Sequence, residues 1–176
     1  MARKNFKEFK KDQEFEQRTI DLARVTRVTS GGKRMRFRAC IGIGNKSGKF
    51  GVGVAKGADV SIAITKGFNQ AKKNIINIPL INGTIPHPVY VKYGAAKVLL
   101  KPAKKGTGIK VGGAVRILCE LSGIANITGK ILGSKNKINN VKAAMIALQS
   151  FKKVRKVESE QKESASAEAM ADKEKK

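Results

Sequence analysis

The stretch Arg34–Ile43, with the sequence RMRFRACIGI, has the clearest period of two in this chain of 176 residues. Successive side chains of a β-strand point to opposite faces, so alternation of this kind predicts a strand. One face carries Arg34, Arg36 and Arg38, and the other carries Met35, Phe37, Ala39, Ile41 and Ile43. We therefore expect a strand with one basic face and one face in the core.

The segment before Arg34 predicts a partner strand and a hairpin. Ile20–Val28 alternates well enough for a strand, with Ile20 and Leu22 on one face. The connection Thr29–Lys33 contains paired glycines, which permit positive φ and favour a tight turn. We therefore expect two strands joined at residues 29–33.

The segment after Ile43 predicts a third strand and a helix. Phe50, Val52 and Val54 alternate there with Gly51, Gly53 and Ala55. The strand has one nearly bare face, which another backbone can approach closely. Asp59 is expected to cap a helix whose apolar positions follow the 3.6-residue period, namely Val60, Ala63, Ile64, Gly67, Phe68, Ala71 and Ile75. The first unit is thus predicted to have three strands and one helix.

Pro79, Asn82-Gly83 and Pro86 indicate a domain boundary, after which the sequence predicts a second unit. We expect strands at His87–Tyr93, Lys97–Pro102 and Ile124–Leu132, a Gly-rich loop at Lys104–Gly113, a short helix that ends at Gly123, and a helix at Asn139–Phe151. The expected organisation is an extension at 1–18, domains at 19–76 and 77–151, and a tail at 152–176. Within the tail, Val157–Lys176 has the composition of a disordered segment.

The charge of the chain is strongly one-sided. Its 37 Lys and Arg outnumber 13 Asp and Glu, which gives a net charge of +24. Between Thr19 and Phe151, 23 cations face three acids, Asp21, Asp59 and Glu120. A field of this kind favours a polyanionic partner. A membrane surface would require an amphipathic helix with a bulky apolar face, which no segment provides, so we expect nucleic acid and no membrane.

Motifs for catalysis, cofactors or metals are missing from the sequence. The glycine clusters match neither a Walker loop nor a dinucleotide fingerprint. His87 is the only imidazole and stands between two prolines, which is more typical of packing than of acid–base catalysis. Cys40 and Cys119 are expected to be buried free thiols, too few for a structural zinc. We therefore expect no enzyme and no cofactor, and a cytoplasmic protein, since the N-terminus resembles no secretory signal.

Cations on predicted turns and strand faces are the candidate phosphate contacts, because affinity for RNA rises with the number of phosphates neutralised. The candidates are Arg27, Lys33, Arg34, Arg36, Arg38, Lys46, Lys49, Lys56, Lys72, Lys73, Lys104, Lys105 and Lys110. The Gly-rich loop is the most specific feature, since its glycines permit close approach and the following helix N-terminus favours anions. Tyr90 and Tyr93 are the only tyrosines, which favours structured RNA over single strands.

The sequence resembles the family of ribosomal protein number five of the bacterial small subunit. The resemblance runs from Val25 to Leu148 and rests on several motifs along the chain. These are Gly31–Ala39, Gly48–Lys56, Ala71–Asn74, Asn82–Pro88, Gly106–Ile109 and Gly112–Arg116.

This resemblance implies an α+β fold. Its N-terminal domain would be like a double-stranded-RNA-binding domain, with three strands plus a helix, followed by a C-terminal α/β two-layer domain. The implied function is that of a structural constituent of the small ribosomal subunit, which binds 16S ribosomal RNA and supports subunit assembly and translational accuracy.

The resemblance also implies specific neighbours. They are ribosomal proteins four and eight, close to where messenger RNA enters, and no homo-oligomer is implied. Gly108 and Arg116 fall where the family contacts ribosomal protein four, and Thr29–Arg34 resembles its RNA-facing loop.

Two alternatives remain open at this point. A free-standing RNA chaperone or regulator could be built on the same domains. An RNA-modifying or RNA-cleaving enzyme would require general acids or a metal site, which the sequence does not provide.

Overall fold

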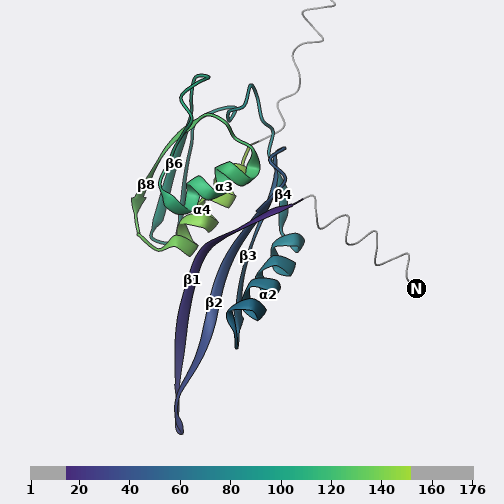
Figure 1. Cartoon of the computed structure of the whole chain (residues 1–176). Coiled ribbons are helices and arrows are strands. Elements are labelled where there is room, and N and C mark those ends of the chain that lie inside the picture. Colours follow the sequence, from purple (N-terminus) through teal and green to yellow (C-terminus); the bar gives the residue numbers. More distant parts are fainter. Residues whose placement is uncertain (1–14, 152–176) are drawn as a thin grey trace, which may run out of the picture.

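The computed structural model describes residues 15–151, which form two four-stranded sheets and three helices (Figure 1). The first sheet has the strand order β1-β2-β3-β4 and the second has β5-β6-β8-β7. The first unit comprises β1 (Glu16–Thr29), β2 (Gly32–Gly44), β3 (Lys49–Gly57), α2 (Val60–Lys73) and β4 (Ile75–Asn77). The second comprises β5 (Val89–Tyr93), β6 (Ala96–Pro102), β7 (Ile109–Lys110), α3 (Gly113–Ser122), β8 (Ile127–Gly133) and α4 (Lys137–Gln149). The expected tail and most of the expected extension lie outside the described residues.

The elements stack as four layers, with the second sheet first, then α3 and α4, then the first sheet, and finally α2 (Figure 1). Helix α3 contacts β1, β2 and β3, whereas α4 packs on β5 and β6. One apolar core therefore joins the two units, and it contains Phe50 and Cys40 together with Leu118, Val98 and Leu148. A second, smaller core between the first sheet and α2 is built on Ala39, Ile41 and Ala63.

Strand β2 is covered on both faces in its second half, which the sequence did not indicate. Every residue from Cys40 to Gly44 is buried, because α2 covers one face and α3 covers the other. A Cβ at Gly42 would lie 2.8 Å from the Leu121 side chain, and one at Gly44 would overlap the Leu121 backbone. The face that continues from the arginines is thus part of the core beyond Arg38.

The bare face of β3 receives helix α2, as its glycines predicted. A Cβ at Gly51 would lie 2.5 Å from the Ala71 carbonyl oxygen, and one at Gly57 would lie 2.6 Å from the Ala63 nitrogen. At Gly53 the added atom would overlap the Gly67 carbonyl oxygen. The helix therefore packs directly against the strand backbone.

The N-terminal elements differ from the expectation in two places. Strand β1 begins at Glu16, so the end of the expected 1–18 extension belongs to this strand. A register shift between Thr19 and Asp21 leaves Ile20 buried in the core that faces α3. The bulge reverses the alternation, and Leu22, expected on the same face as Ile20, is 45% exposed.

Helix α2 also ends earlier than the pattern indicated. Asn74 is its C-cap, and Ile75 starts the short strand β4, which pairs with β3 and makes a fourth strand in this sheet. Asp59 occupies the N-cap position, but its side chain makes no capping hydrogen bond. The cap of α4 is formed instead, since Asn136 Oδ1 accepts from the Ile138 nitrogen.

The hairpin tip extends beyond the rest of the first unit (Figure 1). Strand β3 ends at Gly57, opposite Phe37, so nothing pairs with β2 on that side before this point. Met35, expected in the core, is consequently 49% exposed, and Phe37 is only half-buried. The apolar face of this strand therefore enters the core only from Phe37 onward.

Both thiols are free and buried, as expected. Burial raises the pKa of Cys40 to about 11 and that of Cys119 to about 12. The thiolate, which is the nucleophile, is therefore scarce at neutral pH in the folded chain. We expect a thiol-specific reagent at about pH 8 to modify neither cysteine in the native protein and both in urea, as measured by mass spectrometry. Rapid labelling of the native chain would show that the core around α3 is open.

Candidate nucleic-acid interface

The hairpin of β1 and β2 carries cations on one face. Arg34, Arg36 and Arg38 alternate along β2, and the ladder places Arg27 directly opposite Arg34. On the other side of β2, Lys56 of β3 lies opposite Arg38. Directly opposed residues share a face of the sheet. We call these five residues the hairpin basic face.

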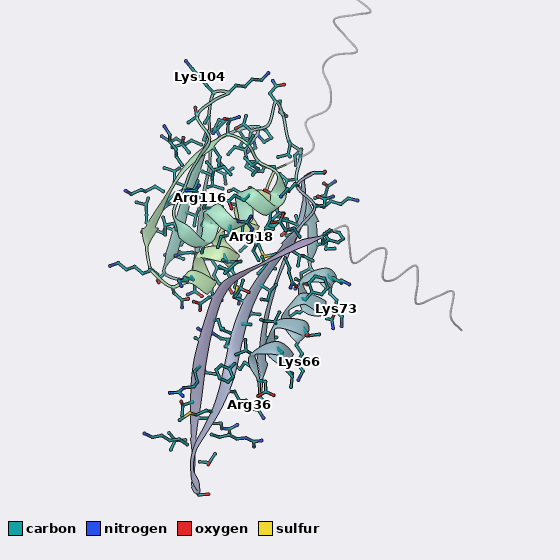
Figure 2. All side chains as sticks on the ribbon, viewed as in Figure 1. Arg18, Arg36, Lys66, Lys73, Lys104 and Arg116 are labelled. Atoms are coloured by element: carbon teal, nitrogen blue, oxygen red, sulfur yellow. The ribbon has the colours of Figure 1, made fainter. Side chains whose placement is uncertain are left out.

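Two hollows adjoin this face, and the second also reaches the opposite face of the hairpin, which carries Met35 and packs on α2. The first, of about 270 Å³, is lined by Val25, Thr26, Arg27, Thr29, Arg34, Arg36 and Lys56. The second, of about 300 Å³, is lined by Arg34, Met35, Arg36, Lys56, Gly57, Ala58, Ile62 and Lys66. Arg34, Arg36 and Lys56 line both hollows, and no carboxylate lines either one. Figure 2 shows Arg36 near the hairpin end of the molecule and Lys66 on the adjacent helix.

The geometry of the face suits a polyanion. Arg27 and Arg34 stand directly opposite each other, and like charges in that position destabilise a sheet. A phosphate group between them would remove this repulsion and accept charge-assisted hydrogen bonds from both guanidinium groups. The opposed arginines can therefore accept an anion between them.

Two of the predicted hairpin cations, Arg38 and Lys33, differ in their surroundings from Arg34 and Arg36. Arg38 Nη2 lies 3.5 Å from Asp21 Oδ2, and Asp21 also accepts from Lys137 Nζ at 3.2 Å. Lys33 lies opposite Val28, on the face that also carries Met35. Arg38 therefore forms an ion pair with a carboxylate, and Lys33 points away from the hairpin basic face.

A chain of ion pairs links β1 to α3. Two further candidate site residues, Lys46 and Arg116, belong to it. Lys46 Nζ pairs with Glu16 at 2.6 Å, and Glu16 also pairs with Arg18 at 3.2 Å. Arg18 in turn pairs with Glu120 at 2.8 Å, and Glu120 pairs with Arg116 at 2.9 Å. Three of the four carboxylates among residues 15–151, namely Glu16, Asp21 and Glu120, are thus held in ion pairs between parts of this chain. Arg27, Arg34 and Arg36, near the end of the hairpin, form no ion pair with any described residue.

The pKa of Glu16 is lowered, first by its hydrogen bond to Lys46 and then by that to Arg18. A lowered pKa in the folded state means that the pairs stabilise the fold above the ordinary value of 4.5 and that this stabilisation is lost as pH falls below it. We expect the free energy of unfolding in urea to fall less between about pH 6 and about pH 3 for Glu16→Gln than for the parent. Asp59→Asn is the control, because it removes a carboxylate outside these pairs, and its free energy of unfolding should fall as much as that of the parent. If the free energy of unfolding of Glu16→Gln also falls as much as that of the parent, the ion pairs of Glu16 do not stabilise the fold.

The remaining candidates of the first unit lie apart from the hairpin tip. Lys49 is exposed at the start of β3. Lys72 Nζ lies over the Phe68 ring, 4.5 Å from its centroid, and Lys73 is exposed near the end of α2 (Figure 2).

The Gly-rich loop lies at the opposite end of the molecule from the hairpin, as Lys104 and Arg36 show in Figure 2. Lys104, Lys105 and Lys110 are exposed. Gly108 has a φ of +71°, its nitrogen donates to Asn126 Oδ1 at 3.0 Å, and its carbonyl accepts from the Ile127 nitrogen at 3.1 Å. The loop is thus tied to the second sheet and does not join the hairpin in one site.

Sequence reasoning missed Lys66 as a site residue. It lies on α2 and lines the second hollow together with Arg34 and Arg36. The position of Lys66 in the helical pattern does not indicate a contact with the hairpin, because only the packing of α2 on β3 brings Lys66 there.

Metal ligands, the lone histidine and the helices bear on the other kinds of site. Within residues 15–151, no group of three or more His, Cys, Asp or Glu side chains is arranged to hold a metal ion. The His87 ring makes an edge-to-face contact with Phe151, with 5.0 Å between centroids, in agreement with a packing role. None of the described helices is both long enough and apolar enough to cross a bilayer.

Comparison with known proteins adds three findings. The family model described as ribosomal protein S5, N-terminal domain, matches residues 15–79, and the model described as ribosomal protein S5, C-terminal domain, matches residues 91–161. The chain is 49% identical over 145 residues to the small ribosomal subunit protein uS5 of Thermotoga maritima, and the match covers 82% of each chain. The first match contains the first sheet with α2, and the second contains most of the second sheet with α3 and α4.

Proposed function

The chain belongs to the ribosomal protein S5 family of the bacterial small subunit, and we propose that it binds 16S ribosomal RNA mainly through the hairpin basic face. Members of this family are structural, non-enzymatic components of the ribosome. The chain is therefore not an enzyme, and its place is the cytoplasm, within the small ribosomal subunit.

The observation that carries the proposal is the arrangement of charge at the hairpin. Arg34, Arg36 and Lys56 line two adjoining hollows without a carboxylate, whereas most of the described carboxylates are paired elsewhere. Cations at several heights on a rigid strand ladder match the repeated phosphates of RNA. The hairpin thus offers phosphates a preformed surface.

We propose that the first unit acts as a domain of the double-stranded-RNA-binding kind, spanning about residues 19–76, with the C-terminal domain at 77–151. Within the first unit, the antiparallel sheet β1–β4 packs against one helix, α2, and this arrangement supports the interpretation. Domains of that kind recognise duplex RNA through its shape and phosphates, over about 16 base pairs. The other predicted cations, from Lys46 and Lys49 to Lys72 and Lys73, would extend the contact along the same unit.

The second unit is proposed to contact ribosomal proteins four and eight, close to where messenger RNA enters. A Cβ at Gly108 would meet nothing within 4 Å, so the loop surface there is open to a neighbour. Arg116 is exposed on α3, although Glu120 Oε1 accepts a hydrogen bond from its Nε at 2.9 Å. Through these contacts the protein would support subunit assembly and translational accuracy.

Sedimentation tests the proposed function. The protein is expected to remain on small subunits in stoichiometric amount after a high-salt wash, because many contacts with phosphates and with neighbouring proteins hold it on the subunit. Arg34→Gln/Arg36→Gln should be retained less well than the parent. A pool found mainly free of ribosomes would favour an RNA chaperone or regulator instead.

A further inference from the structure

The second sheet has an open face on the outside of the molecule. Helices α3 and α4 cover the other face, on which Ala96, Val98 and Leu100 are buried. By the strand register, the side chains of the open face are those of Tyr90, Lys92, Lys97, Leu99, Lys101, Lys110, Thr128, Lys130 and Leu132. We call this set the open sheet face.

Five lysines lie on the open sheet face without any carboxylate. Strands β5 to β8 contain no Asp or Glu. Lys92 lies directly opposite Lys97, and Lys101 and Lys110 flank Thr128 from the two neighbouring strands. Like charges placed directly opposite each other destabilise a sheet, and lysine is depleted in strands. An anionic partner would relieve this repulsion.

Apolar and aromatic side chains lie between these lysines. Tyr90 is 55% exposed and stands opposite Leu99, which is itself opposite Lys130. Leu132 is 40% exposed and stands opposite Lys97. An exposed aromatic ring on a basic sheet is the arrangement on which unpaired bases stack. A duplex hides the faces of its bases and would leave the Tyr90 ring without such a contact.

We propose that the open sheet face binds an unpaired segment of ribosomal RNA, with a base stacked on Tyr90 and phosphates held by the lysines. The inference rests on the proposed function in taking ribosomal RNA as the ligand. This surface faces away from the first sheet and is separate from the hairpin basic face (Figure 1).

Two probes distinguish the two surfaces in the full-length chain. They are an oligouridine of about 12 nucleotides and an RNA duplex of about 16 base pairs, each titrated at several salt concentrations. For Lys92→Gln/Lys97→Gln, the slope of log K against log salt for oligouridine should flatten by about 1.4, which is two contacts at about 0.7 each. The melting temperature should not fall, since a repulsive pair is removed. Duplex binding should stay parental.

Lys135→Gln/Lys142→Gln is the matched control, because it removes two exposed lysines that lie outside both surfaces. It should leave the oligouridine slope at the parental value. An oligouridine slope unchanged in Lys92→Gln/Lys97→Gln would overturn the inference, and so would an equal loss of duplex binding in that variant. Failure of the proposed function is a separate result, namely unchanged duplex binding in Arg34→Gln/Arg36→Gln.

Tyrosine fluorescence tests the stacking contact directly, since the chain has no tryptophan and two tyrosines. Oligouridine should quench this fluorescence in the parent, and Tyr90→Leu should lose the quenching and about 5- to 150-fold in affinity. Tyr93→Phe is the control, because Tyr93 lies on the face covered by helices, with Lys142 Nζ 5.5 Å from its ring centroid. Parental affinity in Tyr90→Leu would overturn the stacking assignment.

Discussion

Arg34→Gln/Arg36→Gln is expected to lower the affinity for an RNA duplex of about 16 base pairs by up to about 60-fold at about 0.1 M salt. Each phosphate contact contributes about 0.9 to the slope of log K against log salt, so the slope should flatten by about 1.8. Both side chains are exposed and line the two hollows, and neither forms an ion pair with a described residue. The melting temperature measured by circular dichroism should therefore stay parental.

The matched control for this variant is again Lys135→Gln/Lys142→Gln, which changes the net charge by the same amount. If both variants weaken duplex binding equally, binding depends on net charge and not on the hairpin. A parental salt slope in Arg34→Gln/Arg36→Gln would likewise contradict the assignment of the hairpin basic face.

Gly53→Ala is expected to destabilise the fold by about 3 kcal/mol or more. The added methyl group would overlap the Gly67 carbonyl oxygen and lie 2.6 Å from the Ala71 nitrogen, both of them backbone atoms of α2. A backbone cannot rotate out of the way as a side chain does, so the whole helix must shift. The melting temperature should fall by roughly 10 °C.

Gly31→Ala is the control for this steric argument. An added Cβ at Gly31 would meet nothing within 4 Å, so its melting temperature should change little. If Gly53→Ala melts within about 1 °C of the parent, α2 does not pack against the β3 backbone as described.

Periodicity predicted the local elements of this chain well. The alternation of Arg34–Ile43 appears in β2, the glycines of β3 receive α2, and Gly123 ends α3 with a φ of +82°. These features depend on neighbours in the sequence or on one adjacent element. Local patterns are therefore sufficient for them.

Contacts between residues far apart in the sequence could not be predicted from such patterns. The second buried face of β2 exists because Leu121 of α3 packs on Gly42, far away in the sequence. The short strand β4 depends on its pairing with β3, whereas the residues themselves continue the apolar period of α2. Packing with partners distant in the sequence overrides local propensity at these positions.

Sequence reasoning named Arg27, Arg34, Arg36 and Lys56 of the candidate site, but it missed Lys66 and did not give the grouping of the cations. Arg34, Arg36 and Lys56 come together as alternation and pairing require, yet the Gly-rich loop with Lys104 lies at the other end of the molecule (Figure 2). Charge counting along the chain gives no distance between two loops in different units. It also gives no indication that Glu16 and Glu120 hold Lys46 and Arg116 in ion pairs.

A cryo-EM map of the native small subunit tests the central claim most directly. It should place the guanidinium groups of Arg34 and Arg36 and the ammonium group of Lys56 within hydrogen-bond distance of phosphate oxygens of 16S ribosomal RNA. Density for RNA should fill the hollows between Arg27 and Lys66. A map in which this face of the hairpin packs on another protein or faces solvent would contradict the account.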